Sequence, residues 1–138
     1  MSRALTIAAC LCIGAGSGHA SDDCGALLKA AGALRAEGEG YTVAFVPQPS
    51  PLASGRHFAL DIAVCPGPGV ALPKGLQVDA DMPAHKHGMN YRASVAARGP
   101  GLYHAEGLML HMPGRWRFIF DLALDGRSAR LTHEVDVP

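Results

Sequence analysis

The chain has 138 residues, a usual size for one domain, and its 12 lysine and arginine residues balance 12 aspartate and glutamate residues. No basic run occurs, which argues against binding to nucleic acid or to an anionic membrane surface. No apolar stretch after the first twenty residues is long enough to cross a bilayer as a helix.

The first twenty residues are typical of a secretory signal sequence. A short basic start is followed by an apolar run over residues 4–13 and by small residues up to Ala20. Cleavage after Ala20 would leave Ser21 as the amino terminus. It would remove one basic and no acidic residue, which leaves 11 against 12 and a net charge of −1. A lipid-modified Cys10 is the alternative. Either way, the sequence predicts a periplasmic or otherwise exported protein.

Two cysteines, Cys24 and Cys65, remain after the signal sequence. An even pair in an exported chain indicates a disulfide formed in an oxidising compartment. A thiolate metal site is the alternative, although no Cys-x-x-Cys spacing supports it. The sequence therefore predicts a Cys24–Cys65 bridge.

Residues 21–40 are predicted to form a helical amino-terminal extension. Residues 21–23 offer a serine and two carboxylates that suit the start of a helix. Residues 26–36 are rich in alanine and leucine, which are strong helix formers. Gly38 and Gly40 then end the predicted helix.

From Tyr41 onward the apolar residues recur with period two, which is typical of strands. Segments bounded by proline and glycine turn signals predict strands at residues 41–46, 57–64, 76–82, 90–97, 102–111, 115–124 and 129–137. Gly107 is expected at a bulge and Trp116 in the core. About seven short strands predict an all-β fold for residues 41–138, an antiparallel immunoglobulin-like β-sandwich.

Two loops concentrate the side chains with the most possible chemistry. The first carries His85, His87 and Met89, and the second carries His111 and Met112. Neutral imidazole and thioether groups are the donors that soft and borderline metals prefer, copper above all. The sequence therefore predicts a copper site, for Cu(I), Cu(II) or both, that is built from these five residues.

Chain order should bring the two loops together. Successive antiparallel strands with short connections reverse at alternate ends of a sheet. The chain leaves the first loop, runs down through residues 90–97 and returns up through residues 102–111. The second loop is therefore expected at the same pole as the first.

Because imidazole must be neutral to bind a metal, copper affinity should fall in acid.

The other histidines and methionines have more ordinary interpretations. His57 and His133 lie singly on predicted strands, where packing or surface roles are usual. His104 is expected to form a surface pair with an acidic residue on its own strand. Met82 and Met109 are expected to fill the core, a common use of methionine.

Three segments carry a family resemblance: residues 81–89 (Asp-Met-Pro-Ala-His-Lys-His-Gly-Met), residues 101–103 (Gly-Leu-Tyr) and residues 111–116 (His-Met-Pro-Gly-Arg-Trp). They resemble the YtkA-like family of small exported bacterial domains, whose layout is related to that of FixH-type domains. The similarity extends over about residues 41–137. It implies an immunoglobulin-like sandwich and a role in copper handling. Histidine stands here for part of the methionine in the family's first loop, which leaves both copper oxidation states open.

Two functions follow from these residues. The first is a periplasmic copper carrier or chaperone that exchanges metal with a periplasmic or membrane copper or redox protein. The second is a non-metal interaction module that docks on an exported or membrane redox complex and uses the methionine-containing loops as a contact surface. No hydrolase, metalloprotease or phosphate-loop motif occurs in the sequence, so an enzyme is not expected.

Overall fold

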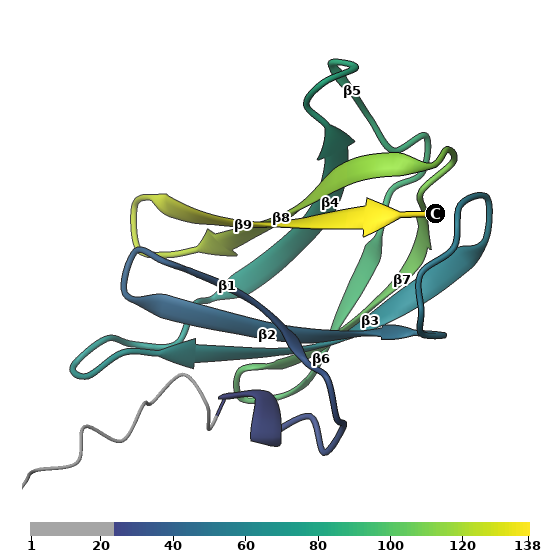
Figure 1. Ribbon diagram of the computed structural model, residues 1–138. Coiled ribbons are helices and arrows are strands. Elements are labelled where there is room, and N and C mark those ends of the chain that lie inside the picture. The colour runs from purple at the N-terminus through teal and green to yellow at the C-terminus, as the bar shows by residue number, and fades with distance from the viewer. Residues whose placement is uncertain (1–23) are drawn as a thin grey trace, which may run out of the picture.

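The computed structural model describes residues 24–138 as two antiparallel β-sheets packed face to face. Figure 1 shows the two layers, with β2 and β3 in one and β4, β8 and β9 in the other. The predicted all-β sandwich is therefore confirmed. The predicted signal sequence and its cleavage point lie outside the described residues.

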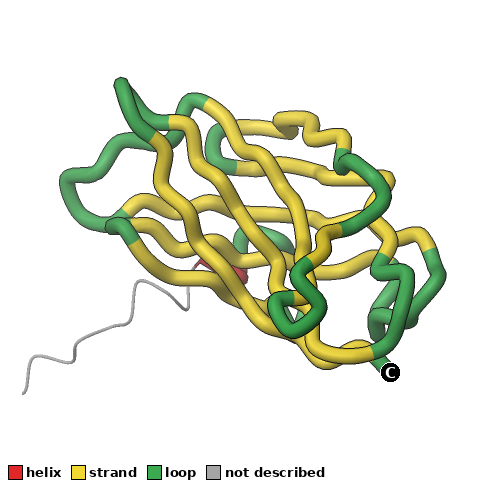
Figure 2. The backbone as a smooth tube through the Cα atoms, turned by 90° about the horizontal axis from the view of Figure 1, so that it is seen from above, coloured by secondary structure: helices red, strands yellow, loops and turns green. Residues whose placement is uncertain are grey.

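Nine strands and one helical turn, at residues 24–26, make up the described part of the chain. The strands are β1 (Leu34–Gly38), β2 (Tyr41–Gln48), β3 (His57–Pro66), β4 (Gly75–Met82), β5 (His87–Gly88), β6 (Ser94–Gly99), β7 (Leu102–Met109), β8 (Gly114–Ala123) and β9 (Ser128–Val137). The five-stranded sheet has the order β1-β2-β3-β7-β6, and the four-stranded sheet has the order β5-β4-β8-β9. Figure 2 shows the strands running along the molecule and the loops gathered mainly at its ends.

The alternation of apolar residues in β8 explains how the two sheets pack. Every second residue of this strand points inward and is fully buried, namely Trp116, Phe118, Phe120 and Leu122. From the facing sheet, the ring of Phe45 in β2 meets the rings of Phe118 and Phe120 at centroid distances of 5.4 and 4.9 Å. Aromatic contacts between the sheets therefore form the centre of the core.

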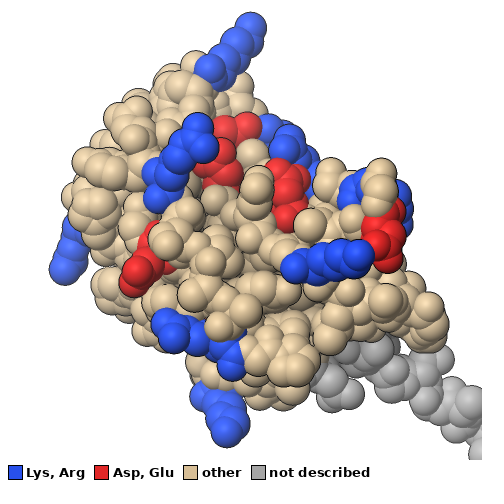
Figure 3. All heavy atoms as spheres, turned by 180° about the vertical axis from the view of Figure 1, so that it is seen from behind, with Lys and Arg blue, Asp and Glu red and all other residues tan. Residues whose placement is uncertain are grey.

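The outward-facing residues of the four-stranded sheet carry charges of both signs. Ion pairs join neighbouring strands there: Arg117–Asp81, Arg130–Asp121 and Arg115–Asp136. Hydrogen bonds to these carboxylates raise the pKa of all three arginines. Figure 3 shows one face of the molecule, on which lysine and arginine side chains lie among aspartate and glutamate.

The predicted helix over residues 26–36 is wrong. The helical turn ends at residue 26, and Leu34–Gly38 forms strand β1, which pairs with β2. Ala36 of this strand is 2 % exposed and belongs to the core. Sheet pairing and burial outweigh the helix propensity of alanine and leucine, which is small for each residue. No helix in residues 24–138 is long and apolar enough to cross a membrane.

The predicted bulge at Gly107 is confirmed. Between the pairs Phe58–Leu108 and Leu60–Ala105, β7 contains one residue more than β3. Gly107 lies in that interval with a φ of 80°, a conformation that glycine adopts without steric cost.

The predicted disulfide between Cys24 and Cys65 is present, with a Cα–Cα distance of 5.9 Å. Cys24 is 1 % exposed and packs with Ala44 and Ala63. These alanines point away from the central core, because their neighbours in sequence point into it. The bridge therefore holds the amino-terminal segment against the outer side of the five-stranded sheet.

Replacing both cysteines with serine is expected to lower the free energy of unfolding by about 4 kcal/mol, because the bridge closes a long loop in the unfolded chain. The sequence separation of the two cysteines is 41 residues. Urea unfolding of the two proteins measures the difference. A difference below about 1 kcal/mol would show that the bridge contributes little to stability.

Candidate metal centre

The connection from β4 to β5 is a tight turn that begins at Met82. The backbone N–H of His85 donates to the carbonyl oxygen of Met82 at 3.0 Å. Pro83 is the second residue of this turn, a position that favours proline. Lys86, with a φ of 55°, bends the chain further, and His87 then pairs with Met82. The sequence of the loop thus places His87 directly beside the last residue of β4.

His87 is the middle member of a row of three imidazoles. Its ring centroid lies 5.8 Å from that of His85 and 5.1 Å from that of His111. His85 is exposed, whereas His87 and His111 are half-buried. The predicted meeting of the two loops at one pole is therefore confirmed for their histidines.

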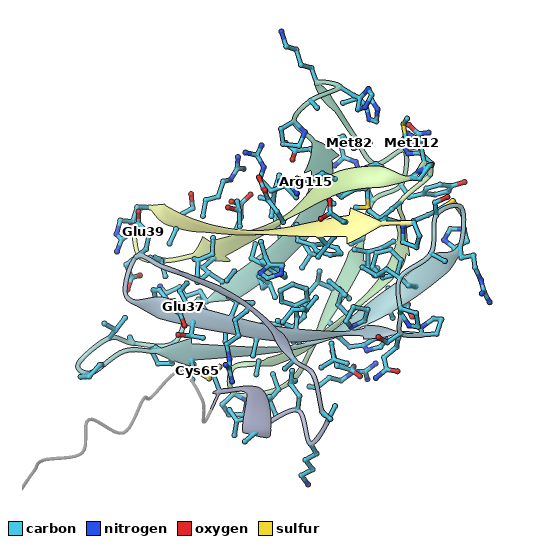
Figure 4. The ribbon with its side chains drawn as sticks, viewed as in Figure 1. Glu37, Glu39, Cys65, Met82, Met112 and Arg115 are labelled. Atoms are coloured by element: carbon cyan, nitrogen blue, oxygen red, sulfur yellow. A yellow bond between two sulfur atoms is a disulfide. The ribbon has the colours of Figure 1, made fainter. Side chains whose placement is uncertain are left out.

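Met82 and Met112 add two thioethers to the same cluster. His87 contacts both methionines, and Figure 4 shows them at one end of the sandwich. Met82 occupies the last inward position of β4 and is 1 % exposed, as its predicted core role requires. Met112 is half-buried and packs against the core. Met82 is thus both a core residue and a neighbour of His87.

Trp116 forms the inner wall of this cluster. Its ring centroid lies 5.2 Å from that of His111 and 5.9 Å from that of His87. Its indole N–H donates to the carbonyl oxygen of Met112 at 2.9 Å. The last pair between β4 and β8 is Asp81–Arg117, and the next position along both strands sets Met82 opposite Trp116. The indole therefore contacts both loops and fixes the position of the second one.

The two half-buried imidazoles have nitrogens available for a ligand. His111 Nδ1 is buried and makes no hydrogen bond in the described structure. His87 Nδ1 lies 3.3 Å from the carbonyl oxygen of Gly88. With a proton on Nδ1, His87 keeps the lone pair on Nε2 free. A buried nitrogen without a partner costs free energy, which a bound metal would offset.

The carboxylate next to the first loop does not join the cluster. Asp81 precedes Met82, so its side chain points to the opposite, outer face of β4. There Arg117 donates to both of its carboxylate oxygens, at 2.9 and 2.6 Å. Within residues 24–138, no three histidine, cysteine, aspartate or glutamate side chains form a group that could hold a metal ion.

The donors at this pole fit a soft metal ion. An imidazole nitrogen lies about 2.0–2.1 Å from a bound metal, so two rings on one ion have centroids roughly 5 Å apart. The separation of the His87 and His111 rings, 5.1 Å, agrees with this geometry. Thioethers and neutral imidazoles suit copper, and Cu(I) in particular, better than a hard cation.

Met89 lies in a different environment from the other four predicted ligands. Its side chain lines a groove between β4 and β6, together with Leu76, Val78 and Val95. Its backbone N–H donates to the carbonyl oxygen of Ala80 at 3.0 Å. His87 contacts Met82, which the sequence assigned to the core, and Met112.

The three remaining histidines of the described chain have other partners. His57 lies against Tyr91, His104 Nδ1 lies 2.7 Å from Asp61, and His133 packs on Phe45. His133 also bonds through Nδ1 to the carbonyl oxygen of Arg35 in β1. The predicted packing and surface roles agree with these contacts, although the acidic partner of His104 comes from β3 rather than from its own strand.

If this pole binds Cu(I) through Met82, replacing Gly114 with alanine is expected to weaken that binding about tenfold, because the new methyl group would displace Met82. A Cβ at Gly114 would lie 2.8 Å from Met82 Cε, and the φ of 125° adds backbone strain of about 1–3 kcal/mol. Gly126→Ala is the matched control, because Gly126 has a φ of 68° and nothing within 4 Å of its Cβ position. Competition titration measures the affinities. Equal copper affinity in the two variants would contradict a role for Met82.

Comparison with protein families shows that the chain belongs to the YtkA-like family, whose model matches residues 35–121. The match covers more than half of the chain and includes both loops of the cluster. No curated protein and no solved structure gave a significant match.

Proposed function

We propose that this YtkA-like sandwich is a periplasmic copper-binding protein that acts as a copper carrier or chaperone. The observation that carries the proposal is the contact of His87 with both Met82 and Met112 at one pole. The ring centroid of His111 lies 5.1 Å from that of His87, and His111 contributes a buried nitrogen without a partner in the described structure. One imidazole and two thioethers form a neutral donor set for Cu(I).

The position of the cluster suits transfer of the metal between proteins. Met82 is buried, His87 and Met112 are half-buried, and His85 is exposed at the outer end of the row. The donors thus run from the surface inward over a short distance. His85 would receive or release the ion, and His87 with the methionines would hold it. A site that opens to the surface allows ligand exchange with a partner, unlike a closed structural site.

We also propose that the protein is exported from the cytosol, and the disulfide supports this. Cys24 and Cys65 are joined in the described chain. Disulfides persist in oxidising compartments such as the periplasm and are rare in the cytosol. A predicted partner is therefore another periplasmic copper protein, or the exposed part of a membrane one.

The groove between β4 and β6 favours a second candidate function, an interaction module. The groove has a volume of about 550 Å³ and is lined in part by Leu76, Val78 and Met89. The Ala80 carbonyl bonds to Met89 across this edge of β4. Leu76 and Val78 are separated from Ala80 by even numbers of residues, so their backbone N–H and C=O groups point to the same edge of β4. Among the described residues, no strand pairs with β4 at these two positions on that edge. An extended segment of a redox complex would add to such an edge.

An anaerobic Cu(I) titration and an aerobic Cu(II) titration of the mature chain, each followed by intact-mass measurement, test the proposal. We expect one copper ion per chain and tighter binding of Cu(I). His57→Ala is the control, because His57 lies against Tyr91, outside the cluster. Absence of bound copper in both titrations would reject the carrier function and leave the interaction module.

A further inference from the structure

Trp116 is the single tryptophan of the chain, and it is fully buried beside the candidate metal centre. Its ring lies within 6 Å of the rings of both His87 and His111, measured between centroids. Both imidazoles stand nearly perpendicular to the indole, at interplanar angles of 67° and 82°. We propose that the indole of Trp116 is a further member of the site and makes it selective for a monovalent soft cation, Cu(I) or Ag(I). This inference rests on the proposed copper function.

The donors of the site limit the charge that it would hold. The donors, from Met82, His87, His111 and Met112, are all neutral side chains. The neighbouring carboxylate of Asp81 is bound to Arg117 on the other face of the sheet. The cost of removing an ion from water rises with the square of its charge, so an unneutralised dication costs about four times as much as a monocation of equal size. Burial beside Met82 and Trp116 therefore favours Cu(I) over Cu(II) or Zn(II).

The indole of Trp116 can itself attract a cation. The face of an aromatic ring carries negative charge, and tryptophan attracts cations more strongly than tyrosine or phenylalanine. This attraction grows when the cation is removed from water. Trp116 is 0 % exposed and its ring centroid lies 5.9 Å from that of His87, so a cation held by His87 would lie close to the indole. The indole would offset part of a single positive charge without the cost of burying a carboxylate.

The chain holds the indole of Trp116 in place. Its N–H donates to the carbonyl oxygen of Met112, which belongs to the loop of a proposed ligand. In β8 it is paired with Val135 of the adjacent strand, and it lies opposite the position of Met82. The ring therefore does not need to move to meet an ion between the two loops, and this lowers the free-energy cost of binding.

Because Trp116 is the only tryptophan, fluorinated tryptophans can replace it throughout the chain without mutation. Added fluorine atoms weaken the negative face of the ring in steps while they keep the indole N–H and nearly the same shape. We expect Ag(I) and Cu(I) affinity to fall stepwise with fluorine number, by about tenfold in total. Quenching of the tryptophan emission gives a second readout. Cu(II) affinity should be lower from the start and change less than twofold.

The outcomes separate the inference from the proposed function. If the unmodified chain binds neither Ag(I) nor Cu(I), the proposed function itself fails. If it binds them but affinity does not change along the fluorine series, the role of the indole is rejected and the copper function stands. If Cu(II) or Zn(II) binds as tightly as Ag(I), the selectivity is rejected. Urea unfolding of each fluorinated protein checks that the fold is unchanged.

Discussion

Replacing His87 with alanine is expected to reduce Cu(I) affinity by about 100-fold or more, since loss of a residue that only supports a ligand already costs 10–100-fold. His87 is the side chain that contacts both methionines and lies between the other two imidazoles. Competition of the purified chain with a chromogenic Cu(I) chelator measures the loss.

Two control variants define this result. His85→Ala should reduce affinity by less than tenfold, because His85 is exposed at the outer end of the row. His57→Ala should have no effect. Both variants and His87→Ala should unfold at nearly the same urea concentration, because His57 and His85 are exposed and His87 is only half-buried. Wild-type Cu(I) affinity in His87→Ala would place the site elsewhere.

Replacing Phe45 with alanine is expected to lower the free energy of unfolding by about 3–5 kcal/mol. Phe45 is fully buried between the sheets and contacts the rings of Phe118, Phe120 and His133. Alanine would leave a cavity that the flanking strands cannot close without moving the sheets. Urea or thermal unfolding measures the change.

Leu27→Ala is the matched control for this prediction. It also shortens a large apolar side chain, but Leu27 is 54 % exposed. Its replacement should change the free energy of unfolding by no more than about 0.5 kcal/mol. Similar losses in the two variants would contradict the assignment of the core to the space between the sheets.

The sequence predicted the sandwich because most of its strands are long and have a clear period of two. The pattern in residues 115–124 predicted a strand, which is β8 in the structure, and the inward-facing residues of β8 are buried. Strand β1 was missed because an alanine-rich segment has no such alternation. The sequence contained one local signal for this hairpin, which is Gly40. In the structure, Glu39 and Gly40 both have positive φ and form the two-residue loop between β1 and β2. Glycine in the second position of such a turn is common.

The sequence predicted where the candidate site lies better than which residues form it. Strand order placed His87 and His111 at one pole, and their rings are 5.1 Å apart. The roles of Met82 and Met89 depend on side-chain directions that loop geometry sets. The strand position of Met82 predicts a core residue, which is correct, but the last inward residue of a strand also faces the pole. Pairing within the two-residue strand β5 could not be foreseen from the period of so short a segment.

X-ray absorption at the copper edge of the Cu(I)-loaded chain tests the central claim most directly, because it distinguishes sulfur from nitrogen neighbours of the metal. In a chain that begins at Ser21, the two cysteines are both in the disulfide, so protein sulfur bound to copper would come from methionine. We predict two sulfur neighbours and at least one imidazole nitrogen, with loss of one sulfur in Met82→Leu and another in Met112→Leu. A spectrum with nitrogen and oxygen neighbours alone, unchanged in both variants, would contradict the His87–Met82–Met112 site.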